Sequence, residues 1–399
     1  MKSILVIKQG LGIGGSETLT IRMCNWLVDK GVNVVLLVEK RPEKIAKELN
    51  TKIAKITYNG SFLELLNKQR AKHLVKKHQL EGCDCIYGYG PLELVTSLSL
   101  GRFIKDSKAM IGVYHKNAYN QINGNKVFKK FTQRLFKKIS QKNILFMNGP
   151  VRKSHEEILS CDFKNAKIWP LPLLVPKYKE VHHRTNKIVS VGNLKRFKSY
   201  NMTMIDVVKD LIDKGYNIEY DIYGEGYMQK KMEEKIGNLG LSKYVNIKGQ
   251  VAYEKFAEVV REGFAFVGLG TAVLEAASFG VPAITCVSYS EKPISFGFVN
   301  ELTNYNVGSP INNYTYKNII DLLELLINAD DPTYEKIRKE NYQYVNENFE
   351  LNKVMKQFLI HHKDADVINY TSKFKKLIFL IYLSSIIDRI KILIKKLLK

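Results

Sequence analysis

The chain has 399 residues, which exceeds one ordinary hydrophobic core and suffices for two domains. A composition of 45% hydrophobic and 25% charged residues, with 26 glycines and 10 prolines, excludes a fibrous or broadly disordered protein. The formal net charge of +23 predicts an anionic partner, which could be nucleic acid, the phosphates of a nucleotide or an acidic membrane surface.

The cysteines and the N-terminus indicate the compartment. Five cysteines form an odd set without zinc-site spacing, so we expect reduced thiols and no disulfide. The apolar run at residues 4–7 is too short for a signal-peptide core, and no segment reaches the ~20 apolar residues of a membrane span. We therefore expect a cytoplasmic protein whose contact with the inner face of the cell membrane is peripheral.

Short apolar runs alternate with helix-length segments along the first 150 residues, starting with a strand at 4–7, a helix at 16–30 that Ser16 caps, and a strand at 34–38. This order predicts parallel strands joined by crossover helices. Prolines then interrupt the pattern near Trp169, and the alternation restarts at Ile188. The further expected strands are 53–58, 85–88, 110–114, 144–147, 188–191, 220–223, 245–248, 264–267 and 283–286.

This organisation predicts an α/β protein with two Rossmann-like domains that face a cleft. We place the N-terminal acceptor domain at 1–170 and the C-terminal donor domain, with its linker, at 171–360. Residues 361–399 form a basic amphipathic tail.

Two glycine-rich turns follow expected strands. Gly10-Leu11-Gly12-Ile13-Gly14-Gly15, with Glu39 after the next strand, has the outline of a dinucleotide fingerprint, although a tight turn without a ligand explains the same glycines. In the second half, Gly268-Leu269-Gly270-Thr271 precedes a short alanine-rich helix that Thr271 caps and that stops at Gly280. The free N–H groups of that helix suit a diphosphate, and Glu275 suits ribose hydroxyls. A Glu275 without such partners would simply lie at the surface.

The second half resembles the donor domain of family-4-type retaining glycosyltransferases, which have the GT-B fold. The similarity rests on Gly192-Asn193-Leu194 followed by Lys198-Ser199, on Gly224-Glu225-Gly226, and on Leu274-Glu275-Ala276 with Gly280-Val281-Pro282. In the first half, Gly14-Gly15-Ser16-Glu17 and the strand that leads to His115 resemble two further family elements.

The resemblance assigns a role to each matching residue. Glu275 would bind the ribose, Lys198 and the amides at Gly270 and Thr271 the diphosphate, and His115 would act on the donor sugar, although a histidine after a strand is often only a polar loop residue. The implied substrate-binding residues are Gly14, Gly15, Asn193, Lys195, Arg196, Lys198, Gly224, Glu225, Gly268, Gly270, Thr271, Ala272, Val273 and Glu275.

The sequence departs from the family pattern at two positions. Val267 replaces the first of two glutamates that are usually eight positions apart, and Asn193 replaces the usual arginine. The positive charge must then come from Lys198 together with Lys195 or Arg196. The resemblance implies no metal and no cofactor, because a nucleoside-diphosphate sugar is the co-substrate.

Basic apolar segments predict a membrane contact. Residues 107–155 contain eleven lysines and arginines and no acidic residue, and Val127, Phe131, Leu135 and Ile139 recur every four residues within them. An ordinary solvated helix packed on its sheet would show the same pattern. Residues 373–399 carry eight basic residues against Asp388, and we expect them to bind anionic lipid, or else a partner protein, and to be dispensable for donor binding. Their apolar stripe comprises Phe379, Leu383, Ile386, Ile390, Leu393 and Leu397.

We therefore expect a glycosyltransferase that moves a sugar from a nucleotide-sugar donor to a lipid-linked or glycan acceptor, in surface polysaccharide biosynthesis. An NAD-dependent dehydrogenase or a nucleotide-sugar epimerase of the same fold are alternatives. A basic nucleic-acid-binding protein is the non-enzymatic alternative. It is disfavoured because no nucleic-acid motif occurs and the charge lies beside apolar stripes, so we expect no nucleic-acid partner.

Overall fold

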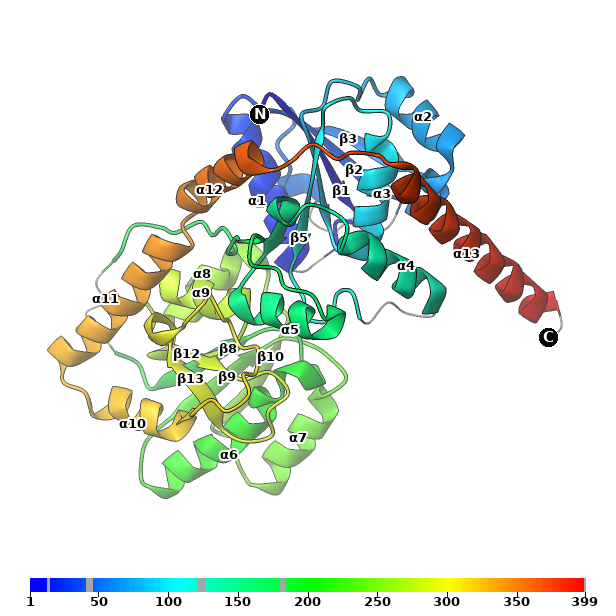
Figure 1. Ribbon diagram of the computed structural model, residues 1–399. Coiled ribbons are helices and arrows are strands. Elements are labelled where there is room, and N and C mark those ends of the chain that lie inside the picture. Colours follow the sequence, from blue (N-terminus) through cyan, green and yellow to red (C-terminus); the bar gives the residue numbers. More distant parts are fainter. Residues whose placement is uncertain (13–14, 41–45, 121–125, 180–183, 398–399) are drawn as a thin grey trace. The chain divides into compact units, whose positions relative to one another are not determined.

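The chain forms two compact units (Figure 1). One unit comprises Met1–Pro172 together with Val354–Lys399, and the other comprises Leu173–Lys353. Each contains a mainly parallel sheet with helices, which confirms the predicted pair of Rossmann-like α/β domains. The computed structural model describes all residues except 13–14, 41–45, 121–125, 180–183 and 398–399.

The first unit is built on a seven-stranded parallel sheet of order β3-β2-β1-β4-β5-β6-β7. β1 lies between β2 and β4, where Leu5 pairs with Val35 on one side and with Ile86 on the other. Its branched side chains are fully buried, as in strands whose two faces are both covered. The strand order reverses at β1, so the carboxyl ends of β1 and β4 form a switch point of the kind at which α/β proteins bind ligands. The strands are β1 (Ser3–Lys8), β2 (Asn33–Glu39), β3 (Ala54–Tyr58), β4 (Cys85–Tyr89), β5 (Lys108–Val113), β6 (Ile144–Phe146) and β7 (Lys167–Ile168).

Helices surround this sheet, and the last of them come from the C-terminal end of the chain. The indole N–H of Trp169 donates to the carbonyl of Val354 at 2.9 Å, and Lys108 Nζ donates to the carbonyl of His362 at 2.9 Å. The helices are α1 (Gly15–Asp29), α2 (Lys68–Lys77), α3 (Pro91–Gly101), α4 (Lys126–Phe136), α5 (Gly149–Leu159), α12 (Leu351–Asp364) and α13 (Ser372–Leu397), with 3-10 turns η1 (Ala46–Glu48), η2 (Phe62–Leu66) and η3 (Gln141–Asn143).

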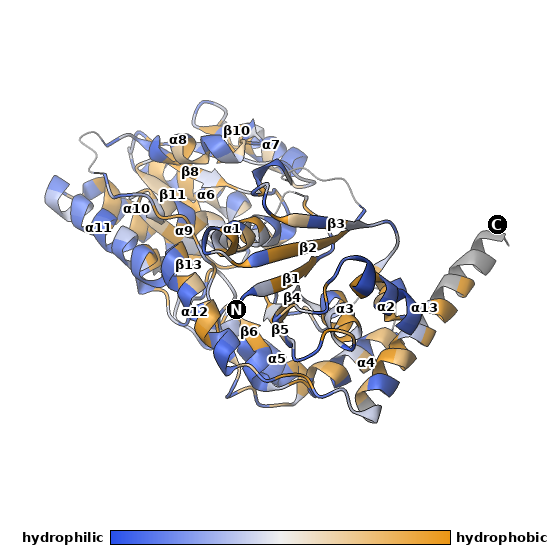
Figure 2. Cartoon of the chain, turned by 90° about the horizontal axis from the view of Figure 1, so that it is seen from above, coloured by the Kyte–Doolittle hydropathy of each residue, from blue (hydrophilic) through white to orange (hydrophobic). Residues whose placement is uncertain are grey.

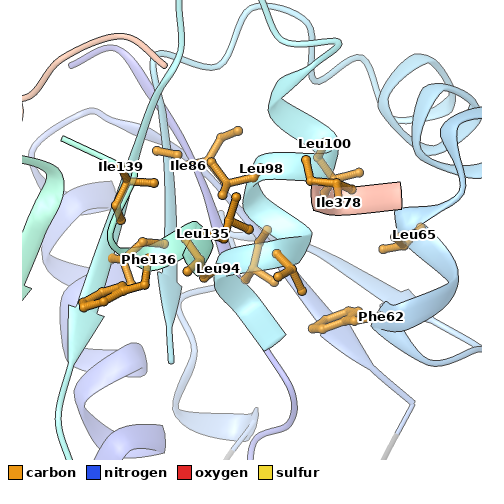
Figure 3. Close-up of a cluster of buried hydrophobic side chains, with 14 of the residues drawn as sticks. Phe62, Leu65, Ile86, Leu94, Leu98, Leu100, Leu135, Phe136, Ile139 and Ile378 are labelled. Atoms are coloured by element: carbon orange, nitrogen blue, oxygen red, sulfur yellow. The ribbon is translucent and has the colours of Figure 1, made fainter. Parts of the chain in front are cut away.

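The core of the first unit includes part of α13. Ile378 lies beside Leu65, Leu98 and Leu100 in this core (Figure 3). The neighbouring α13 residues Phe374, Leu377 and Ile381 are buried in the same cluster.

The expected domain limits need correction at this end of the chain. The boundary that we placed after residue 360, and the separate tail at 361–399, do not match the two units, because residues 354–399 belong to the first one. The physical reason is that α13 carries two apolar faces. The sequence pattern indicated a single exposed apolar stripe, whereas a second apolar face of α13 covers the core of the first unit.

The second unit has a seven-stranded sheet of order β10-β9-β8-β11-β12-β13-β14. The five strands from β10 to β12 are parallel, and β13 and β14 are antiparallel additions. The central strand β8 ends directly before Gly192, and its neighbours β9 and β11 end at glycine turns as well. The strands are β8 (Lys187–Val191), β9 (Glu219–Tyr223), β10 (Val245–Gly249), β11 (Ala265–Gly268), β12 (Ala283–Cys286), β13 (Ile294–Phe298) and β14 (Lys317–Asn318).

The buried guanidinium of Arg338 in α11 fixes the end of α9. Its Nε donates to the carbonyl of Gly280 at 2.6 Å, and it pairs with Glu335 at 2.6 Å and with the carbonyl of Lys179 at 3.2 Å. The helices of the unit are α6 (Tyr200–Asp213), α7 (Gln229–Asn238), α8 (Phe256–Arg261), α9 (Thr271–Ser278), α10 (Ile319–Asn328) and α11 (Asp331–Asn348), with 3-10 turns η4 (Arg196–Lys198), η5 (Tyr253–Lys255) and η6 (Val299–Glu301).

The five cysteines are free thiols, and burial raises the pKa of Cys24 to about 12. Among the helices that the structure describes, none has both the length and the hydropathy to cross a membrane.

Candidate active site

The turns after β8 and β9 lie in direct contact. The N–H of Gly192 donates to the carbonyl of Tyr223 at 2.8 Å, and the N–H of Leu194 donates to the carbonyl of Glu225 at 2.9 Å. A Cβ on Gly224 would overlap the carbonyl oxygen of Gly192, so the residue at 224 must lack a side chain. The two glycine motifs that the sequence separates by some thirty residues therefore form one surface at the end of the sheet.

Lys198 brings a half-buried cation to this surface. Its ammonium occupies the space that a Cβ on Gly192 would need, and it lies 5.8 Å from the centre of the Phe197 ring. Burial lowers the pKa of Lys198 to about 8. Across the described parts of the chain, no carboxylate forms an ion pair with this lysine. A desolvated cation without a counter-ion is costly, so the position favours binding of an anion.

The turn after β11 leads into α9. Gly270, with a φ of 74°, is the N-cap residue, and its N–H donates to the carbonyl of Val307 at 2.7 Å. The predicted Thr271 cap is wrong by one position, because Thr271 is already helical. The N–H groups of Thr271, Ala272 and Val273 have no acceptor within the helix, and they lie at its positive end. The Val273 side chain is fully buried, so this residue can contact a ligand only through its backbone.

Glu275 lies one turn further along α9 and is 9% exposed. Its Oε1 accepts a hydrogen bond from the hydroxyl of Tyr253 at 3.2 Å. The sequence analysis missed Tyr253, since nothing in the stretch around η5 links this tyrosine to a helix twenty residues later. The carboxylate is thus neither a bare surface group nor free to rotate.

Several other predicted donor-site residues are exposed to solvent. Asn193, Lys195, Arg196 and Glu225 are exposed around the two turns. Tyr227, a second residue that the sequence analysis missed, accepts the N–H of Arg196 on its hydroxyl at 2.8 Å. These exposed cations add positive charge beside Lys198 without an obligatory protein partner.

The packing around β11 explains the residue types at two of its positions. Gly268 is buried, and a Cβ there would meet the ring of Phe266 at 2.6 Å. Val267, where the family usually has a glutamate, is fully buried in the core of the unit. Its side chain therefore contributes to packing in this chain.

In the first unit, the start of α1 is attached to the end of β1. Lys8 Nζ lies 2.9 Å from Ser16 Oγ and 3.2 Å from Glu17 Oε1. Gly15 is the first described residue of α1, so Ser16 lies inside the helix and does not cap it as predicted. The predicted residue Gly14 lies outside the described residues.

Glu39 does not fit the role that a dinucleotide site would require. Its carboxylate is 5% exposed and accepts the N–H of Phe62 at 2.6 Å, which holds the start of η2. The glutamate that completed the outline of a dinucleotide fingerprint thus has a structural partner.

His115 follows β5 after Tyr114 and is exposed. Its Nδ1 accepts the N–H of Asn117 at 3.1 Å, so the neutral ring carries its proton on Nε2. Desolvation, followed by the charge of Lys116, holds the pKa of His115 below its ordinary value. The geometry favours a neutral imidazole that presents an N–H donor.

A buried carboxyl group lies near the switch point of the first sheet. Glu93 in the first turn of α3 is 5% exposed, and burial raises its pKa to about 7, against the opposing effect of Lys8. The buried hydroxyl of Tyr89 has no hydrogen-bond partner among the residues described. The sequence analysis missed both groups, because neither belongs to a recognisable motif.

Comparison with known proteins gives a family for the second unit. Residues 176–344 match the family model of glycosyl transferases, group 1. No curated protein sequence matches the chain.

Solved structures extend the similarity over most of the chain. Anabaena Alr3699/HepE, in complex with UDP and glucose, is 12% identical with a TM-score of 0.64, covering 91% of this chain and 100% of its own. A glycosyltransferase from Rickettsia africae ESF-5 is 14% identical with a TM-score of 0.64, covering 91% and 98%. The lipopolysaccharide outer core galactosyltransferase WaaB, in its apo form, is 13% identical with a TM-score of 0.61, covering 91% and 99%.

At such low identities these structures show the fold, and the family model matches within the second unit. Together they confirm the resemblance found in the sequence: residues 176–344 match the group 1 glycosyltransferases, and the two Rossmann-like domains have the GT-B fold.

Proposed function

We propose that the protein transfers a sugar from a nucleoside-diphosphate sugar to a lipid-linked or glycan acceptor, in the biosynthesis of a surface polysaccharide. The observation that carries this proposal is Lys198, a half-buried and desolvated cation with no carboxylate partner among the described residues, which follows β8 while α9 follows the adjacent strand β11. Parallel neighbours end at the same edge of a sheet, so the lysine and the free N–H groups of α9 serve the same edge.

Each part of a nucleotide-sugar has a proposed contact. Lys198 and the amides of Thr271 and Ala272 would bind the diphosphate, and Glu275, oriented by Tyr253, would accept hydrogen bonds from the ribose. His115 would donate from Nε2 to the donor sugar. As the bond between the anomeric carbon and the diphosphate oxygen breaks, these cationic and N–H groups stabilise the charge on the leaving diphosphate. The bond that forms joins the same carbon to the oxygen of an acceptor hydroxyl, whose proton passes to the oxygen of the departing diphosphate.

The finer features of the reaction are part of the same proposal. We propose a retaining transfer that requires neither metal nor cofactor, at the inner face of the cell membrane. The similarity to a structure in complex with UDP and glucose and to a lipopolysaccharide galactosyltransferase supports the donor and acceptor classes.

A thermal-shift screen of the full chain with UDP-, GDP-, ADP- and dTDP-sugars tests the donor. We expect one base to raise the melting temperature, and the shift to disappear in Lys198→Met. Lys230→Met is the matched control, because Lys230 is an exposed lysine of α7 in the same unit. Stabilisation by NAD instead of any nucleotide-sugar would contradict the proposal.

A further inference from the structure

The helix α13 has two apolar faces with different environments. The inner face packs into the core of the first unit through Phe374, Ile378 and Ile381. The hydroxyl of Tyr382 also accepts a hydrogen bond from Asn67 at 3.4 Å. The outer face carries large apolar side chains at spacings of four, four and three, which places them on one side of the helix. These are Phe379 (55% exposed), Leu383 (38%), Ile387 (52%) and Ile390 (49%).

The neighbouring helix α4 adds positive charge beside this stripe. α4 packs on α13, and Figure 2 shows the two helices side by side with apolar residues on both. Phe128 and Leu135 anchor α4 in the core, whereas Lys126, Lys130 and Arg134 are exposed at intervals of four.

Most of the charge around the stripe is positive, since residues 373–399 carry eight basic residues against Asp388. Val127 on α4 is 48% exposed, and Lys375 and Lys376 are exposed at the start of α13. No acidic residue occurs anywhere in 107–155, so α4 places no carboxylate among these cations. We call this surface the α4/α13 face, and it comprises Lys126, Val127, Lys130, Arg134, Lys375, Lys376, Phe379, Leu383, Ile387 and Ile390.

We propose that the α4/α13 face docks on a bilayer that contains anionic phospholipid. Exposed apolar side chains flanked by lysines match the two components of such a surface, since the apolar groups enter the acyl boundary while the cations contact the headgroups. A second copy of the chain would bring cations against cations on this face. An acidic membrane, in contrast, satisfies both the charge and the apolar area.

The attachment is rigid, because the inner face of the same helix is part of the core of the first unit. Docking of the α4/α13 face deepens the proposed function, because a lipid-linked acceptor would be presented to a domain held directly at the bilayer. The docking proposal rests on the proposed function only for the identity of that acceptor. Deleting 364–399 is not a clean test, because it would remove Phe374, Leu377, Ile378 and Ile381 from the core.

The test is flotation of the full chain with vesicles of phosphatidylcholine alone or with an equal part of phosphatidylglycerol. Lys126→Gln/Lys130→Gln/Arg134→Gln should weaken binding to the anionic vesicles roughly a hundredfold, since each cation near such a surface is worth about fivefold in affinity. The control Lys230→Gln/Lys231→Gln/Lys243→Gln removes three exposed lysines of the second unit and should bind as the parent does. Added salt should weaken the parent far more than the α4 variant.

The apolar part is tested with Phe379→Ser/Ile387→Ser, which should reduce vesicle binding at least tenfold. Its matched control is Ile360→Ser on α12, an equally exposed residue (55%) of the same unit. Unchanged melting temperatures show that the variants fold.

Three results would overturn the proposal: equal flotation of both variant sets and the parent, equal binding to vesicles without phosphatidylglycerol, or a dimer that dissociates in the Ser variant while lipid binding persists. The donor screen separates the two proposals. Flotation as expected without any nucleotide-sugar shift would leave the docking face standing and remove the proposed donor, whereas the reverse result would remove only the face.

Discussion

Replacing Lys198 should expose the main electrostatic feature of the proposed donor site. Burial lowers the pKa of this lysine from 10.5 to about 8, which corresponds to about 3 kcal/mol against the charged form. A bound diphosphate restores a favourable environment for the charge and therefore raises that pKa. Because hydrogen bonds to charged groups contribute ~1.5–3 kcal/mol, Lys198→Met should lower nucleotide-sugar affinity roughly tenfold to a hundredfold at pH 7.

The pH dependence gives a sharper signature. With a free pKa of about 8 and a higher one in the complex, the affinity of the parent should fall about fourfold between pH 7 and pH 8.5, since the neutral lysine must first take up a proton. Titration calorimetry in buffers of different ionisation enthalpy measures this uptake directly. Lys198→Met should show neither the fall nor the uptake, and Lys198→Arg should bind without pH dependence.

The same shift predicts an opposite effect on stability. A lysine whose pKa is depressed in the folded state opposes folding when charged, so stability should rise with pH from about 8 towards 10.5. Lys198→Met should accordingly raise the melting temperature of the unliganded protein at pH 7 while it weakens the donor. Identical proton uptake by parent and Lys198→Met would refute this reasoning.

Four further changes test other parts of the structure. Glu275→Ala should weaken nucleotide-sugar binding roughly tenfold to a hundredfold without unfolding the protein, and an unchanged titration would remove its ribose role. His115→Ala should lower turnover far more than nucleoside-diphosphate affinity, whereas equal losses would make it an ordinary loop residue. Glu93→Gln should raise the free energy of unfolding by up to ~3 kcal/mol above pH 7 and leave it unchanged below pH 4.5, because the parent loses stability as pH rises through its raised pKa of about 7. If urea titrations give the same difference between variant and parent at both pH values, Glu93 is not buried in its neutral form. Arg338→Met should lower the urea midpoint, with a loss of ~3–5 kcal/mol as the Gly280 carbonyl loses its donor and Glu335 loses one of its partners. An effect no larger than that of replacing an exposed lysine would contradict this role.

Much of the second unit follows from the sequence because its determinants are local. Gly192, Gly224 and Gly270 mark turns that side chains would obstruct, and a short helix between Gly270 and Gly280 is evident from composition. The choice of cap was wrong, because a glycine with positive φ and a threonine are adjacent and both suit a helix start.

The rest depends on long-range packing, which leaves no local pattern. The sequence identifies Lys198 as a cation near a glycine turn, yet its depressed pKa arises only when Gly192 and the neighbouring turns enclose it. Tyr253 contacts Glu275 only in the folded unit, so their pairing leaves no local pattern. The prolines near Trp169 mark where the chain leaves the first unit, but no comparable signal marks where α12 packs on that unit again. For α13, hydropathy shows that two faces are apolar but not which of them the core will cover.

The return of α12 and α13 to the first unit has a consequence for the order in which the protein is made. The second unit is a contiguous segment of the chain, Leu173–Lys353, and all of its strands are available once that segment has left the ribosome. Synthesis of the first unit begins before that of the second unit and is completed after it. Trp169 and the Leu65–Leu98 cluster pack against residues of α12 and α13, which are translated after the second unit. A nascent or prematurely terminated chain therefore exposes an apolar surface on its first unit. Chaperones and proteases can bind this surface and so distinguish incomplete chains from complete ones.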